Sequence, residues 1–292
     1  MSARAERFLV AAALALAGAC AQAQAPQPQG EPEAPPRTAF RVCEDPNSLP
    51  FSNDKGEGFE NRIAELFAKD LRLPLKYYWF PNRMNFIRNT LRFKLPTDDY
   101  PCDIVMSVPA EFDQVSVTKP YYRSSYVLVY PKGKALEGVR SSEDLLGMPQ
   151  AKLAALHIGL YDKSPASRWF ARHKLVDIGV PYQIMNADPS ANPGQDIERD
   201  LLQGKLDGAI LWGPIGGNFA KRQRAGEFVV VPMKSEPEVP MDYSIAMGVR
   251  YGEPQWKKQV EDLIARHQEE IHAILVEFGV PLQQADKPEA AK

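Results

Sequence analysis

Strand-like and helix-like patterns alternate along this chain of 292 residues, and this alternation constrains the fold more than any other feature. The first unit runs from Arg41 to Leu71. An apolar strand is followed by a polar loop that begins at Asp45, and then by a segment whose apolar residues recur with helical spacing from Phe59 onward. We expect this loop to lack regular structure, and it is too long for a plain strand-to-helix connection. Loops of this length usually either bind a ligand or are flexible, and we favour binding here.

The same alternation continues to the end of the chain. Further strands are expected near 75–80, 103–106, 126–130, 157–160, 182–185, 208–212, 228–231 and 243–249, with helices between them. A single long helix is expected over 260–278, where apolar residues form one stripe. The pattern predicts an α/β fold with a parallel sheet.

Two proline-bearing segments, near 131–133 and 236–240, divide this series into two lobes. We expect the first lobe to comprise 38–130 plus 237–292, and the second to comprise 131–236. Two extended crossings would then form a two-stranded hinge with a cleft between the lobes.

The N-terminus has the features of an export signal over residues 1–25. Two arginines precede an apolar run that is too short to span a bilayer, and small residues suited to cleavage follow. Cys20 offers an alternative route as a lipid-modified cysteine, but Ala17 stands where such a site usually has leucine, so we favour cleavage past Cys20. Residues 26–37 are rich in proline and are expected to form an extended tether.

Cleavage past Cys20 would leave two cysteines, Cys43 and Cys102, in an oxidising compartment. Each lies at the edge of an expected strand, so neighbouring strands could bring them into a disulfide. The sequence does not give the Cα separation that decides between a disulfide and two free thiols.

Composition and motifs exclude several classes of function. The formal net charge is −2, so no basic excess attracts nucleic acid, and no later stretch is long enough for a transmembrane segment. The four histidines have no metal-site spacing, and neither a nucleophile elbow nor a phosphate-binding loop occurs. We therefore expect no bound metal or cofactor. We also expect no enzymatic activity, because no nucleophile or acid–base pair is recognisable.

Ligands of open α/β sheets bind beyond the carboxyl ends of the strands, which places four loops at the cleft. The candidate cleft residues are Asp45, Asn47, Phe51, Ser107, Asp113, Tyr121, Asp162, Ser164, Trp212 and Asp242. The carboxylates could bind a cation or act in acid–base chemistry, or they could simply form Asx turns. Ser164 could help to bind an anion at a helix N-terminus, or act only as a helix cap.

The order of these elements resembles that of type II periplasmic solute-binding proteins over nearly the whole mature chain. Within that superfamily, several motifs resemble those of the methanol-oxidation J proteins (MoxJ/XoxJ). These motifs are Cys43-Glu44-Asp45-Pro46-Asn47, Leu49-Pro50-Phe51-Ser52-Asn53, Gly56-Glu57-Gly58-Phe59-Glu60-Asn61, Arg88-Asn89-Thr90-Leu91 and Pro120-Tyr121-Tyr122-Arg123-Ser124. The resemblance implies a periplasmic protein associated with an alcohol dehydrogenase that depends on pyrroloquinoline quinone (PQQ) and on calcium or a lanthanide. The dehydrogenase, rather than this chain, would carry the cofactor and metal.

Amino-acid receptors of this superfamily hold the ligand's carboxylate with an arginine shortly before the Pro-Tyr pair. Here the corresponding loop, 109–114, has no arginine or lysine and contains Glu111 and Asp113. These two carboxylates would repel the carboxylate of an amino acid, so we do not expect the chain to serve in amino-acid import. Two functions remain: an accessory protein that binds or matures the dehydrogenase, and a transport receptor for a small metabolite, cofactor or cofactor precursor.

Overall fold

The structure is a computed structural model that describes residues 36–82, 85–97, 99–183 and 193–283. The expected signal (1–25) and nearly all of the expected tether lie outside these ranges. The described residues from Arg37 onward form one compact unit. None of the helices in the described ranges is both long enough and apolar enough to cross a membrane.

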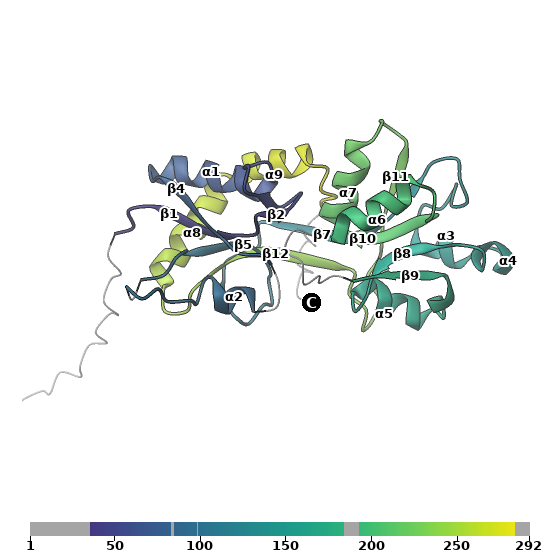
Figure 1. Ribbon diagram of the computed structural model, residues 1–292, viewed down its shortest axis with the longest axis horizontal. Coiled ribbons are helices and arrows are strands. Elements are labelled where there is room, and N and C mark those ends of the chain that lie inside the picture. Colours follow the sequence, from purple (N-terminus) through teal and green to yellow (C-terminus); the bar gives the residue numbers. More distant parts are fainter. Residues whose placement is uncertain (1–35, 83–84, 98, 184–192, 284–292) are drawn as a thin grey trace, which may run out of the picture. The chain divides into compact units, whose positions relative to one another are not determined.

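The first half of the sheet is built around β1, which is parallel to both of its neighbours. Strands β4 (Leu75–Trp79), β1 (Phe40–Glu44) and β5 (Ile104–Pro109) are followed by β12 (Asp242–Val249), which is antiparallel to β5 and also pairs with β6 (Ser116–Val117). The helices of this half are α1 (Phe59–Leu71), α2 (Phe86–Asn89), α8 (Pro254–Arg266) and α9 (Gln268–Glu277) (Figure 1). Apolar faces of α1, α8 and α9 pack on the sheet in one core that includes Phe40, Phe67 and Trp256.

The second half of the sheet continues through β7 (Tyr122–Pro131) to β10 (Gly208–Trp212), β8 (Ile158–Tyr161) and β9 (Gly179–Tyr182), while β11 (Phe228–Pro232) pairs with β7. Its helices are α3 (Ser142–Leu146), α4 (Gln150–Leu153), α5 (Pro165–Arg172), α6 (Pro193–Leu202) and α7 (Gly213–Arg222), with a 3₁₀ turn at Val176–Ile178. The α/β prediction is confirmed, but the sheet is mixed rather than parallel, because β7, β11 and β12 run antiparallel to neighbours.

One strand, β7, belongs to both halves of the sheet. Residues 122–125 pair with β12, and residues 126–131 pair with β10 and β11. The change of partner falls at Tyr126, whose N–H donates to the carbonyl of Met241 and whose carbonyl accepts from the N–H of Met233. The two lobes are thus joined inside a continuous strand, and β12 runs beside it (Figure 1). The lobe limits at 130/131 and 236/237 stay predictions.

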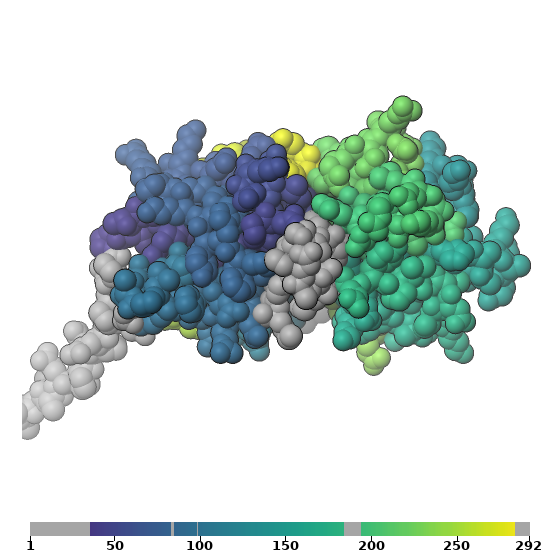
Figure 2. Space-filling view, viewed as in Figure 1, coloured from purple at the N-terminus to yellow at the C-terminus, as the bar shows by residue number. Residues whose placement is uncertain are grey.

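The prediction of one long C-terminal helix is wrong, because the chain forms two helices, α8 and α9, with a bend at His267. The imidazole Nε2 of His267 lies 2.7 Å from the carboxylate of Asp70, so a polar contact interrupts the apolar stripe. Beyond α9 the chain reaches the second lobe: the side-chain amide of Asn218 in α7 donates to the carbonyl of Phe278. In Figure 2 the yellow end of the described chain accordingly lies against the green region of α7.

Smaller differences concern single elements. The expected strand at 182–185 is shifted to Gly179–Tyr182, and residues 184 and 185 lie outside the described ranges. The glycine-rich segment that begins at Gly213 opens helix α7, with proline in its first turn, and forms no nucleotide-binding turn.

Candidate functional site

The loop that follows β1 is a fixed structure that docks on the first turn of α1. It contains a small hairpin of β2 (Asn47–Ser48) and β3 (Ser52–Asn53), contrary to the expectation of a loop without regular structure. The backbone N–H of Phe59 donates to the carbonyl of Pro50, and that of Glu60 donates to the carbonyl of Phe51, each at 2.9 Å. A Cβ atom on Gly58 would lie 2.0 Å from the Phe51 carbonyl oxygen, so this close approach requires glycine.

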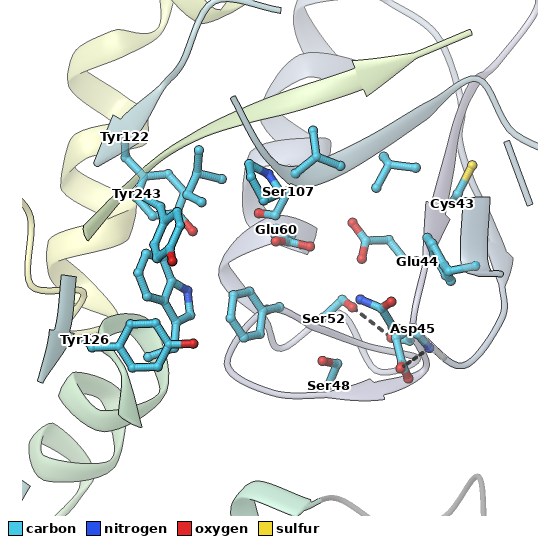
Figure 3. A pocket seen from close by; sticks show the side chains of 18 of the residues that line it. Cys43, Glu44, Asp45, Ser48, Ser52, Glu60, Ser107, Tyr122, Tyr126 and Tyr243 are labelled. Atoms are coloured by element: carbon cyan, nitrogen blue, oxygen red, sulfur yellow. Dashed lines mark hydrogen bonds between the residues drawn. The ribbon is translucent and has the colours of Figure 1, made fainter. Parts of the chain in front are cut away.

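A buried amide completes this docking. The Oδ1 atom of Asn61 accepts from the backbone N–H groups of Asn53 (3.1 Å) and Gly58 (3.0 Å). Together these bonds satisfy donors at the start of α1 and fix the direction of Glu60 in its first turn. Glu60 therefore lies opposite Glu44, the last residue of β1, at the inner wall of a cavity (Figure 3).

The cavity has a volume of about 450 Å³ and is lined from both lobes. The first lobe contributes residues at the ends of β1 and β5, the hairpin and α1. The second contributes Pro165 and Arg168 of α5 and Trp212 at the end of β10. Tyr122 and Tyr126 of β7 and Tyr243 of β12 lie between them. A site at the carboxyl ends of strands and at the meeting of two lobes is the usual place for a small ligand in such folds.

Two carboxyl groups dominate the inner wall. Glu44 and Glu60 are each 4 % exposed, and one oxygen of each, Oε1, has no hydrogen-bond partner within the described residues. Burial raises the pKa of Glu60 to about 7. Burial, and then the nearby charge of Glu60, raise the pKa of Glu44 well above its usual value. At neutral pH the pair therefore carries less than two negative charges.

Hydroxyl groups adjoin this pair. The hydroxyl of Tyr121 lies 3.0 Å from Ser107 Oγ and donates to the carbonyl of Met106. The hydroxyl of Tyr122 is buried without a partner among the described residues. Burial raises the pKa of both tyrosines, so their hydroxyl groups stay protonated and act as donors at neutral pH.

The outer part of the cavity has aromatic walls. The Trp212 ring centroid lies 5.5 Å from that of Tyr126 and 5.9 Å from that of Tyr243, both in inclined arrangements. Phe51 lines the same cavity and packs on Phe59 at 5.2 Å. These rings form a surface for the apolar body of a ligand.

The structure places four of the ten predicted cleft residues in the lining: Asp45, Phe51, Ser107 and Trp212. The carboxylate of Asp45, however, accepts from the backbone N–H groups of Asn47 (2.8 Å) and Asn82 (2.6 Å), which is the Asx-turn alternative. It therefore shapes the loop as well as lining the cavity.

The other six candidates do not line this cavity. Asn47 pairs within the hairpin, and Tyr121 lies behind Ser107. Ser164 caps α5 by accepting from the N–H of Ser167, and its hydroxyl donates to the carbonyl of Tyr161. Asp113 and Asp162 are exposed, and Asp242 is ion-paired with Arg123.

The most unusual residues of the site, Glu44 and Glu60, were not among the predicted site residues. No acid–base pair was recognisable in the sequence, whereas the structure buries both carboxyl groups. A usable signal was present: Glu44 lies on the same strand face as the apolar Phe40 and Val42, directly before the Asp-Pro turn. Tyr126, Arg168 and Tyr243 were also missed, because only the fold brings them together.

The disulfide prediction is confirmed, since Cys43 and Cys102 are bonded with a Cα separation of 5.3 Å. Cys43 belongs to β1, and Cys102 lies just before the neighbouring strand β5. The bond fixes β1 one residue before Glu44.

Metal binding finds no support in the part of the chain that the structure describes, where no group of three acidic, histidine or cysteine side chains could hold an ion. Two histidines are bonded to acids instead: His173 Nε2 lies 2.8 Å from Glu236, and His267 contacts Asp70.

Comparison with known proteins places this geometry in a family. No protein-family model matches the chain. The crystal structure of the periplasmic binding protein XoxJ from Methylobacterium extorquens AM1 is 33 % identical, with a TM-score of 0.67, and the match covers 85 % of this chain and 100 % of that one. MoxJ of Paracoccus denitrificans is 25 % identical over 258 residues, which is 84 % of this chain and 89 % of the relative.

Two further relatives agree. MoxJ of Methylorubrum extorquens is 27 % identical over 267 residues, which is 86 % of this chain and 84 % of the relative. An ancestral cationic amino-acid solute-binding protein has a TM-score of 0.62 at 18 % identity, covering 83 % of this chain and 96 % of that one; this likeness shows the fold alone. The chain belongs to the MoxJ/XoxJ family of type II periplasmic binding proteins.

Proposed function

We propose that this chain is a periplasmic accessory protein of a PQQ-dependent methanol or alcohol dehydrogenase system, and that it acts by binding or maturing the dehydrogenase. The observation that carries the proposal is the match to XoxJ, which extends over the whole of that protein at 33 % identity. The name MoxJ of two further relatives supports a link to methanol oxidation.

The site supports a departure from amino-acid import. The first-lobe wall presents Glu44, Asp45 and Glu60, and among the described lining residues the only basic side chain is Arg168 of the second lobe. A ligand carboxylate next to the buried acid pair would be repelled. The protein thus combines the architecture of a solute receptor with a wall unsuited to the usual solute, and we assign it no catalytic activity and no cofactor of its own.

Co-isolation tests the accessory role. The mature chain is immobilised through a C-terminal tag and incubated with periplasmic extract of its own organism grown on methanol, with an unrelated type II binding protein of similar charge as control bait. We expect the dehydrogenase to be enriched at least tenfold over the control. Failure to enrich it, with and without chemical cross-linking, would contradict the proposal.

A transport receptor for a small non-amino-acid metabolite or cofactor precursor is the second candidate function. The observation in its favour is the cavity itself, which retains buried polar atoms without partners. A thermal-shift screen tests it, because a ligand that binds only the folded state raises the unfolding temperature.

Export belongs to the same proposal: residues 1–25 act as a cleaved signal and 26–37 as a tether. N-terminal sequencing of the exported protein is expected to begin after Ala23 or Ala25. A lipid-modified Cys20 at the new N-terminus would show the alternative route.

A further inference from the structure

We infer that the inner end of the cavity is a binding site for a protonated organic amine, held by Glu44, Glu60 and the hydroxyl group of Tyr122. This assignment goes beyond the proposed accessory role and does not depend on a dehydrogenase partner. It rests on four features of the described residues: unpartnered acceptor atoms, the charge of the Glu44–Glu60 pair, the aromatic walls of the cavity and the position of Arg168.

The inner wall of the cavity holds two buried acceptor atoms without hydrogen-bond partners among the described residues. Oε1 of Glu44 and Oε1 of Glu60 are buried acceptors without a partner in the described chain, although both residues line the cavity. A buried polar atom without a hydrogen bond is costly, so native proteins rarely leave one. Figure 3 shows the two carboxyl groups on the same side of the cavity as Ser107 and Ser52. An ammonium group has only donors, and these match the two free acceptors.

A second, independent group points to the same place. The hydroxyl of Tyr122 is also unpartnered, and its residue, 7 % exposed, lies on β7 rather than on β1 or α1. Its oxygen offers lone pairs to a further N–H group. Three elements therefore present free polar atoms at one end of one cavity.

The charge of the wall selects a monocation. Because two buried carboxyl groups close together resist ionising together, the pair holds fewer than two charges near neutrality. A ligand with one positive charge would neutralise the negative charge that the pair retains, and it would favour ionisation of the two carboxyl groups. A divalent cation such as Ca²⁺ needs six to eight oxygen ligands, and no suitable cluster occurs among the described residues.

The remainder of the cavity favours an apolar body on the amine. Tyr126, Trp212 and Tyr243 form neighbouring aromatic walls, and aromatic faces attract cations as well as apolar groups. Arg168 comes from α5 of the second lobe and repels a cation there. The two lobes therefore orient the ligand, with the ammonium group toward the first lobe.

A charge series on the purified wild-type chain tests the inference. Benzylammonium, benzyl alcohol and benzoate have similar shapes but carry positive, zero and negative charge. Titration calorimetry at pH 7.5 is expected to show saturable binding of benzylammonium at least tenfold tighter than that of benzyl alcohol, and no binding of benzoate. Equal binding of the alcohol, or no binding of benzylammonium, would overturn the inference.

A fourth probe separates hydrogen bonding from aromatic contact alone. Benzyltrimethylammonium carries the same charge without an N–H group. We expect it to bind at least tenfold more weakly than benzylammonium, because it cannot donate to the carboxylates. Equal affinity would show that the acid pair does not hold the ligand in the way we infer.

Matched variants locate the site. Glu60→Gln is expected to weaken benzylammonium binding at least tenfold, whereas Glu65→Gln, the same change at an exposed position of the same helix, leaves it unchanged. Thermal unfolding shows whether each variant folds, and Glu44→Gln replaces Glu60→Gln if the latter does not. Unchanged affinity in a folded Glu60 or Glu44 variant would refute the assignment. Because no dehydrogenase is present, these outcomes leave the co-isolation result to stand or fall separately.

Discussion

Three buried acidic residues of the first lobe differ in their partners: Asp103 is paired with arginine, whereas Glu44 and Glu60 are not. Asp103, whose side chain is 1 % exposed, accepts from Arg41 at 2.8 Å and from Arg250 at 2.6 Å. Glu44 and Glu60 have no basic partner in the described structure and keep one free oxygen each. We therefore expect Asp103 to contribute to stability and the two glutamates to reduce it when ionised.

This contrast predicts a pH dependence for Glu60. Its pKa is about 7 in the folded chain against an ordinary 4.5, so the folded state binds more protons than the unfolded state between these values. The free energy of unfolding therefore falls as pH rises from about 4.5 to 7, on the order of 1.4 kcal/mol per pKa unit. Urea unfolding at pH 5 to 8 is expected to show a steeper loss for wild type than for Glu60→Gln.

The control for this experiment is again Glu65→Gln, which should follow wild type. Glu44, Asp45, Tyr77, Tyr121 and Tyr122 face the same region or influence it electrostatically, so the difference between variants is the informative quantity. Parallel curves for wild type and Glu60→Gln would show that the carboxyl group is not held as described.

Asp103→Asn gives the opposite kind of prediction. The change removes the carboxylate that pairs with both Arg41 and Arg250, and it leaves the buried guanidinium of Arg250, at 8 % exposure, with Glu253 as its remaining carboxylate partner. Removing one member of a buried ion pair typically costs about 3–5 kcal/mol, and we expect a loss of this size in denaturant unfolding at pH 7. The exposed Asp262→Asn, which breaks only a surface pair with Lys258, should change stability by less than about 1 kcal/mol. Equal losses in both variants would contradict the buried network.

At the scale of elements, the contact between the loop and α1 determines where Glu60 points. Gly58→Ala places a methyl group against the Phe51 carbonyl and forces the backbone apart. We expect a loss of about 1–3 kcal/mol in unfolding free energy, and weaker amine binding, because Glu60 follows two residues later. Gly147→Ala, where the nearest backbone atom is 3.2 Å from the added Cβ, serves as the matched substitution. A Gly58 variant as stable as this control would show that the loop yields readily.

The disulfide between Cys43 and Cys102 holds β1, the strand that carries Glu44. Cys43 and Cys102 are separated by 59 residues, and the chain-entropy relation for a loop of that length gives a stabilisation of about 4 kcal/mol. The double variant Cys43→Ala, Cys102→Ala is expected to unfold at correspondingly lower urea concentration, and reduction of the wild-type protein should reproduce the effect. An unchanged midpoint would contradict it.

For the whole molecule, the sequence predicts the fold better than the site. Alternation of strand and helix patterns identifies the α/β class because each pattern is local. The bend at His267 escaped notice because the apolar stripe continues on both sides of it: Leu263 and Ile271 are both buried. The transfer of β7 between partners at Tyr126 depends on contacts with β10, more than eighty residues away in the sequence, which no local pattern encodes.

The site follows the same rule. Asp45 and Phe51 could be predicted because they lie in the loop after β1, and Ser107 because it follows a short apolar run, since residues at and beyond strand ends form clefts. Glu60 could not, because helix periodicity treats a charged residue as exposed unless tertiary contacts bury it. Glu44 had a signal only in its position on the strand. Here the exception coincides with the candidate ligand site, where local patterns are most often broken.

Trp212 gives the molecule an intrinsic fluorescence signal. Its indole lies 5.9 Å from the ring of Tyr243 on β12, which belongs to the other half of the sheet, so a rotation of one lobe against the other would alter the surroundings of that indole. Of the four tryptophans, Trp169 and Trp256 are buried in cores. Saturation with benzylammonium, whose apolar body would lie against Trp212, is therefore expected to change the emission of wild type but not that of Trp212→Phe, so that ligand binding can be followed in solution without an attached dye.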